Sequence, residues 1–191
     1  LDPHRHGVPR NGYSVPASVP LLSERFGAAG WDTLAVVASS ALEAKMGLNR
    51  GFSTWSDPGP APAGGMALLG ADEITRRALS AVDGRADPSA PLLLFVHYYD
   101  AHMPWFTAPP AVVGQFSDPA YAGYVDGGMA AVGRLTAERK SGRLGYADAR
   151  QARALYLAQV GWVDQQVGVL LDGLRERGLG EELLVVATAD H

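Results

Sequence analysis

The sequence predicts an α/β layered domain in which helices flank a largely parallel sheet. Short apolar runs at residues 33–38, 92–96 and 183–187 are typical of strands that are buried on both faces. Helix-like segments separate these runs, and strands that alternate with helices along a chain generally form a parallel sheet. The 23 glycines and 13 prolines among 191 residues favour short elements joined by many turns over a helical bundle.

The first elements are marked by turn residues. Residues 3–16 are typical of a loop, and residues 20–26 predict a short helix that begins at a proline. The apolar strand at residues 33–38 follows. Prolines and glycines then dominate residues 56–65, which predicts a surface loop because proline removes a backbone donor and glycine costs conformational entropy.

The middle of the chain predicts a helix, a strand and an irregular segment. Residues 71–82 predict a helix, since Asp72 and Glu73 near its start suit the positive end of the helix dipole. The strand at residues 92–96 follows it. Residues 104–145 are rich in glycine, proline and alanine without a steady period, so we expect an irregular excursion there.

A long helix is predicted over residues 146–177, ended by Gly178 as a left-handed cap. Its expected apolar stripe recurs at steps of three and four residues. The stripe consists of Tyr156, Val160, Val163, Val167, Leu170 or Leu171, and Leu174. The last predicted strand, residues 183–187, then leads into the polar residues 188–191.

Composition excludes several classes of function. A formal net charge of −4 without a run of lysine or arginine disfavours a nucleic-acid binder, because such proteins neutralise phosphates, and it disfavours binding to anionic membranes. No stretch approaches the roughly 18 to 20 apolar residues of a membrane span. The absence of cysteine excludes disulfides, thiolate metal sites and cysteine nucleophiles within this chain. Oligomeric state and compartment stay open.

Histidines mark the expected site. All five lie outside the predicted helices, in three clusters: His4 and His6, His97 and His102, and His191. In a parallel α/β sheet, ligands bind beyond the carboxyl ends of the strands. Two of these clusters directly follow predicted strands, so we expect their side chains to meet at one edge of the sheet.

Asp190 and His191 follow the last predicted strand and combine a carboxylate oxygen with an imidazole nitrogen. Both atoms are common ligands of divalent cations, so the pair is a candidate metal site. The simpler alternative is that Asp190 caps a following helix and His191 is an ordinary loop histidine. The dipeptide alone favours that alternative.

His97, Asp100 and His102 lie within six residues on the turn after the second predicted strand. A carboxylate there could orient one imidazole while the other donates a proton to a leaving group as a general acid. The structural alternative is that His97 packs at the edge of the strand and His102 merely begins the excursion. No dinucleotide or phosphate loop, nucleophile elbow or His-Glu-x-x-His helix is present, which disfavours hydride-transfer and phosphate-loop chemistry.

Four segments, in chain order, resemble the sulfatase family of the alkaline-phosphatase superfamily. They are residues 2–8 (Asp-Pro-His-Arg-His-Gly-Val), 47–52 (Gly-Leu-Asn-Arg-Gly-Phe), 95–104 (Phe-Val-His-Tyr-Tyr-Asp-Ala-His-Met-Pro), and 160–178 followed by 183–191. The resemblance implies an alkaline-phosphatase-like fold. It also implies that residues 1–191 are a partial catalytic domain, truncated at both ends.

The resemblance implies hydrolysis of a sulfate ester, with a divalent cation neutralising the transferred group. Asp190 and His191 match metal ligands. His102 matches a histidine that contacts the transferred group and protonates the leaving oxygen, while His97 (catalytic) and Asp100 (substrate-binding) match less closely. Calcium is the expected ion, with manganese or zinc as alternatives because imidazole suits them. The substrate would be a small anionic ester, and the likeness implies an exported or periplasmic protein.

Two departures from the family pattern leave alternatives open. The family nucleophile lies upstream of Leu1, so we expect the chain alone to be inactive. The Gly-Lys-Trp-His segment that binds sulfate in classical sulfatases should fall near residues 38–45. These residues here read Ala-Ser-Ser-Ala-Leu-Glu-Ala-Lys. A phosphatase, phosphodiesterase or phosphonate hydrolase on the same fold, a catalytically dead relative that binds an anion or a partner protein, and an unrelated α/β binding domain are therefore alternatives.

Overall fold

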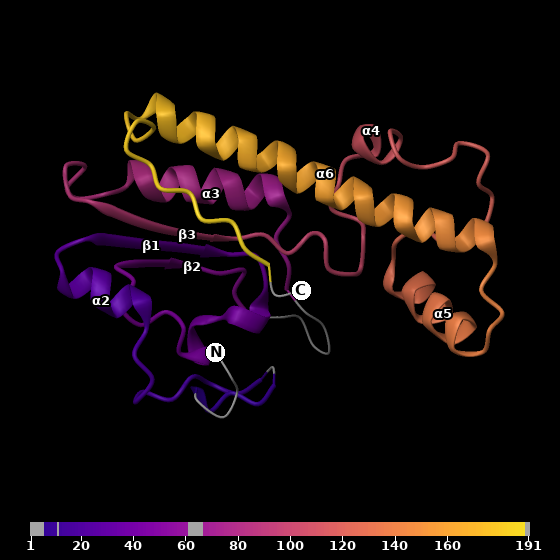
Figure 1. The fold of residues 1–191 in the computed structure, drawn as a ribbon, viewed down its shortest axis with the longest axis horizontal. Coiled ribbons are helices and arrows are strands. Elements are labelled where there is room, and N and C mark those ends of the chain that lie inside the picture. Colours follow the sequence, from indigo (N-terminus) through magenta and orange to yellow (C-terminus); the bar gives the residue numbers. More distant parts are fainter. Residues whose placement is uncertain (1–5, 11, 61–66, 190–191) are drawn as a thin grey trace.

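The computed structural model describes residues 6–10, 12–60 and 67–189. Within them, three parallel strands form one sheet in the order β2-β1-β3 (Figure 1). The strands are β1 (Asp32–Val37), β2 (Thr54–Ser56) and β3 (Leu92–His97). The predicted α/β class with a parallel sheet is confirmed, as are the strands expected at residues 33–38 and 92–96.

The sheet is organised around β1. It pairs in register with β3 along its full length, from Asp32 opposite Leu92 to Val37 opposite His97, and with β2 over a shorter stretch. Leu34 to Val37 are at most 1% exposed, because neighbours cover both edges of β1 and helices cover its faces. β3 is less buried than expected, with Phe95 44% exposed, since it has only one neighbour among the described strands.

Helices cover the sheet in layers. α3 (Ala71–Asp83) lies between the sheet and α6 (Tyr146–Glu176), and α2 (Leu22–Ala28) lies on the other side (Figure 1). These three helices confirm the predicted ones, and Gly178 has the expected left-handed conformation with φ +77°. The main core joins sheet and helices through Leu34, Val36, Ile74, Ala78, Leu170 and Leu174. No described helix has the length and apolar character needed to cross a membrane.

The excursion at residues 104–145 is more ordered than the sequence predicts. It contains α4 (Pro110–Val113) and α5 (Met129–Lys140), and it packs around a second small core of Val125, Leu135 and Leu155. α5 has no strong apolar stripe, and only a few of its residues face this core, so periodicity gives no signal. The short strand β2 and the 3-10 helices Ser40–Leu42 and Ala44–Met46 were also not predicted.

The expected apolar stripe on α6 is correct only in its C-terminal half. Leu170 and Leu174 are buried against α3, but Tyr156 and Val160 are 43% and 39% exposed. In the N-terminal half the helix packs on the excursion instead of on α3, so a different face is buried there. The residues on that buried face are Leu155, Ala158 and Gln159.

The strand predicted at residues 183–187 is wrong for the described structure. This segment belongs to no strand, and Leu184 and Val186 are 85% and 78% exposed. In Figure 1 the yellow trace beyond α6 runs in the direction of the strands without joining the sheet. An apolar run favours burial, but a strand also needs a neighbouring backbone with which to form hydrogen bonds. Neither β2 nor β3 pairs with this segment.

The Gly-Leu-Asn-Arg-Gly-Phe motif has a structural role. The guanidinium of Arg50 donates to the carbonyl oxygens of Pro16, Ala17 and Val19 and pairs with Glu24 at 3.1 Å. These bonds tie the N-terminal segment to the start of α2. Gly51 has φ +77°, and a Cβ atom there would lie 2.3 Å from the backbone nitrogen of Glu24, so only glycine fits this close crossing.

We expect Gly51→Ala to lower the free energy of unfolding by more than about 3 kcal/mol, because it adds a backbone clash to the cost of a left-handed residue. Gly30→Ala is the matched control: Gly30 also has positive φ, at +83°, but open space surrounds it, so its loss should be about 1 kcal/mol. Urea unfolding of the full-length protein measures both. Equal losses would show that the crossing at Gly51 is looser than described.

Candidate functional site

The candidate site lies where the parallel strands end. Because β1, β2 and β3 run in the same direction, Val37, Ser56 and His97 lie at the same edge of the sheet. The ladder continues one step beyond β1, where the amide of Ala38 donates to the carbonyl oxygen of His97 at 3.1 Å. The same amide lies 3.4 Å from Nδ1 of His97, so this imidazole is held against the end of the neighbouring strand.

An aromatic stack brings the two predicted catalytic histidines together. The ring of Tyr99 lies 4.5 Å from that of His102, nearly parallel at 21°. The ring of His97 lies 5.7 Å from the same tyrosine. Tyr99 therefore contacts both imidazoles and limits how each can turn. The sequence placed both histidines at this turn, but it did not distinguish Tyr99 from an aromatic residue of the core.

His102 is exposed, and its tautomer is set by its neighbour. Its Nδ1 atom lies 2.5 Å from the carbonyl oxygen of Met103. A carbonyl oxygen only accepts hydrogen bonds, so Nδ1 carries the proton of this bond. The remaining nitrogen, Nε2, is then the atom that accepts a proton in the neutral ring or donates one in the imidazolium. This tautomer is compatible with a role as a general acid.

Asp100 lies between the two histidines in the sequence, but its side chain faces the start of α3. It is 4% exposed, and its Oδ1 atom accepts a hydrogen bond of 2.9 Å from the backbone amide of Ala71. A carboxylate at this position also suits the positive end of the helix dipole. The other oxygen, Oδ2, is buried without a hydrogen-bond partner among the described residues. Asp100 thus joins the turn after β3 to the first residue of α3.

Tyr98 completes the attachment of this turn. Its hydroxyl group lies 2.8 Å from Oγ1 of Thr75 on α3, and burial raises the pKa of this tyrosine above its ordinary value. The hydroxyl of Thr75 also reaches the carbonyl oxygen of Gln166 on α6 at 3.3 Å. Tyr98 therefore links the turn that carries the histidines to α3, and Thr75 links α3 to α6.

Asp57 directly follows β2 and links the end of this strand to the segment after β1. Its carboxylate accepts hydrogen bonds from the amides of Ala44 and Gly59 and from the indole of Trp55, at 2.9 to 3.1 Å. Burial alone would raise the pKa of Asp57, but these bonds outweigh it and the pKa lies below its ordinary value. An ionised Asp57 holds the short helices after β1 in place.

The expected metal ligands, Asp190 and His191, lie outside the described residues, as does His4. Within residues 6–10, 12–60 and 67–189, no group of three or more histidine, aspartate or glutamate side chains could hold a metal ion. His6 is helical and half-buried, not part of an exposed loop, and its Nδ1 atom accepts a hydrogen bond of 3.2 Å from the amide of Val8.

The contact between Asp100 and α3 predicts a cost to stability. Asp100→Ala should lower the free energy of unfolding by about 1 kcal/mol, because the first turn of α3 loses its acceptor. Asp100→Asn should lose less, since an amide oxygen can still accept from Ala71. Urea unfolding of the full-length protein measures both. A fully stable Asp100→Ala variant with weakened substrate binding would contradict the capping role.

Comparison with solved structures supports the same fold. BT4656, in complex with its substrate D-glucosamine-2-N,6-O-disulfate, matches at a TM-score of 0.66 with 19% identity, over 94% of this chain and 51% of that chain. A Bacteroides thetaiotaomicron protein from work on the metabolism of multiple glycosaminoglycans matches at 0.61 with 16% identity, over 93% and 44%. yidJ from Bacteroides fragilis, which carries a sulfatase assignment, matches at 0.58 with 14% identity, over 93% and 43%.

The chain therefore spans about half the length of these structures or somewhat less. No curated protein matches the sequence. The family model described as Sulfatase matches residues 2–191. That match covers nearly the whole chain and includes both the turn after β3 and the segments beyond the described residues. The chain belongs to the sulfatase family.

Proposed function

We propose that the protein containing this chain hydrolyses sulfate esters and that the turn after β3 carries part of its active site. The family match over residues 2–191 is the observation that carries the proposal. The geometry supports it independently, because His97 and His102 lie together at the edge of the sheet where parallel α/β proteins bind their ligands.

His102 is the proposed general acid. Its Nδ1 proton is held by the carbonyl oxygen of Met103, so the imidazolium would donate its Nε2 proton to the ester oxygen as the bond to sulfur breaks. Tyr99 would keep the ring in this orientation through its parallel stack. His97, held against the end of β1, would line the same site and limit the movement of Tyr99.

A divalent cation is the proposed cofactor, with Asp190 and His191 among its ligands. The donor set fits a divalent ion: a carboxylate suits calcium, while the imidazole also suits manganese or zinc. When bound, such an ion would neutralise negative charge on the transferred group. Among the described residues, no group of three or more histidine, aspartate or glutamate side chains could hold such an ion.

The proposed substrate is a small anionic ester. BT4656 is bound to a disulfated glucosamine, which supports a sulfated substrate for a chain of the same fold. We also propose an exported or periplasmic location, on the family likeness alone.

Hydrolysis of a phosphate ester is the second candidate, and one observation favours it. Residues 38–45 lack the Gly-Lys-Trp-His sequence that grips sulfate in the family. The lysine present there, Lys45, pairs with Glu43 at 2.8 Å. Rates with 4-nitrophenyl sulfate and 4-nitrophenyl phosphate, measured on the full-length protein, decide between the two candidates.

We expect His102→Ala to reduce kcat by about 10²-fold to 10⁴-fold for an alkyl sulfate, whose leaving oxygen needs a proton. The loss should be much smaller for 4-nitrophenyl sulfate, whose leaving group departs without one. Lys140→Ala, on the exposed end of α5, is the control and should leave both rates unchanged. Equal losses for the two esters would exclude His102 as the general acid.

Metal removal tests the cofactor. Dialysis of the full-length protein against a chelator should abolish hydrolysis, and added calcium should restore it, because the transferred group would otherwise keep its full charge. Asp190→Asn should lower the metal content measured by mass spectrometry as well as the activity. Full activity and unchanged metal content in Asp190→Asn would remove this residue from the proposed ligands.

A further inference from the structure

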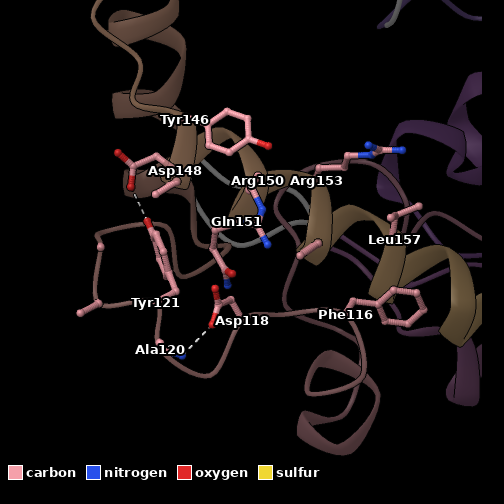
Figure 2. Close-up of a pocket in the computed structure, with 14 residues that line it drawn as sticks. Phe116, Asp118, Ala120, Tyr121, Tyr146, Asp148, Arg150, Gln151, Arg153 and Leu157 are labelled. Atoms are coloured by element: carbon pink, nitrogen blue, oxygen red, sulfur yellow. Dashed lines mark hydrogen bonds between the residues drawn. The ribbon is translucent and has the colours of Figure 1, made fainter.

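A second candidate site lies away from the strand ends. A groove of about 650 Å³ opens between the N-terminal part of α6 and residues 116–123 of the excursion (Figure 2). We call it the distal groove, because this part of α6 extends past the sheet (Figure 1). The side chains that matter for its chemistry are Phe116, Asp118, Tyr146, Arg150, Gln151 and Arg153. None of them belongs to the candidate active site.

Two arginines give the distal groove a positive side. Arg150 and Arg153 lie one helical turn apart, and both are exposed. Within the described part of the chain, neither forms an ion pair with a carboxylate. Figure 2 shows Arg150 extending toward Gln151, while the side chain of Arg153 extends the other way, on the side of Leu157. Guanidinium groups without a carboxylate partner favour sulfate or carboxylate ligands, which they bind through paired hydrogen bonds.

An aromatic ring forms one wall. Tyr146 is 80% exposed, and the guanidinium of Arg150 lies 5.9 Å from the centre of its ring. Phe116, 40% exposed, lines the opposite end in Figure 2. Exposed aromatic faces beside polar groups are typical of binding surfaces, because they offer a large contact area at low entropic cost. A sugar ring, whose C–H faces are apolar, can stack on such a surface.

Gln151 supplies an unsatisfied polar atom in the wall. Its Oε1 atom is buried without a hydrogen-bond partner, while its Nε2 atom reaches Oγ of Ser117 only at 3.4 Å. Exchanging the amide oxygen and nitrogen would still leave one polar atom unpaired. An unpaired buried polar atom costs free energy, and because this atom is closed to solvent, a ligand would reach it only after the side chain turns toward the groove. Asp118 adds a carboxylate with one oxygen engaged by the amide of Ala120.

We propose that the distal groove binds an anionic sugar unit, one that carries a sulfate or carboxylate group beside free hydroxyls. Arg150 would hold the anionic group, Tyr146 would stack on the ring, and Asp118 would bind a hydroxyl. The volume lies within the usual range for small-ligand sites. This proposal does not depend on the hydrolysis proposed above.

The test uses the full-length protein with His102→Ala, to prevent turnover, and a sulfated, uronic-acid-containing tetrasaccharide as the probe. Calorimetric titration should show binding that weakens by at least about tenfold in Arg150→Ala/Arg153→Ala. Tyr146→Ala should also weaken it, and chemical desulfation of the tetrasaccharide should have a similar effect. All substituted groove residues are exposed, so melting temperatures should stay unchanged.

Arg139→Ala/Arg143→Ala is the matched control. It removes the same charge from exposed, nearby positions that do not line the groove, and it should change the affinity by less than about twofold. Equal weakening in both double variants would overturn the proposal, because non-specific electrostatic attraction between the protein and the anionic probe would then explain the binding. Absence of binding at millimolar probe would also overturn it. Hydrolysis of 4-nitrophenyl sulfate, measured with His102 restored, should be unaffected by Arg150→Ala/Arg153→Ala, which separates this site from the active one.

Discussion

The in-register parallel pairing of β1 with β3 is the constraint on which the rest of the structure depends. It fixes Val37 opposite His97, so both strands end at the same edge of the sheet. The amide of Ala38 extends the pairing by one residue and contacts His97 through both its carbonyl oxygen and its ring. A shift of one residue in this register would move His97 to the other face of the sheet and separate it from the turn that carries His102.

Attachment of that turn to the helices is the second requirement. Asp100 caps α3 and Tyr98 joins Thr75, while Tyr99 stacks on His102 and contacts the tilted ring of His97. A histidine on an exposed loop would otherwise sample many orientations, which would weaken proton transfer. The structural and the proposed catalytic residues therefore alternate along one short segment.

The sequence was sufficient to predict an element where the local residue pattern and the final packing agree. Hydrophobicity and caps predict β1, β3 and the length of α6. The direction of the parallel strands predicts that the histidines after β3 lie at the edge of the sheet. The sequence was insufficient where packing partners decide the structure. Residues 183–187 are as apolar as β1 but pair with none of the described strands, and Tyr156 is exposed because the excursion covers another face of α6. Asp100 and Tyr99 were ambiguous, since capping and stacking depend on elements distant in sequence.

A crystal structure of the full-length protein with calcium and sulfate tests the central claim most directly. We expect one sulfate within hydrogen-bond distance of Nε2 of His102, in contact with an ion bound by Asp190 and His191, at the edge of the sheet formed by β1 and β3. An ion and sulfate bound elsewhere, or His102 and Asp190 on opposite sides of the molecule, would contradict it.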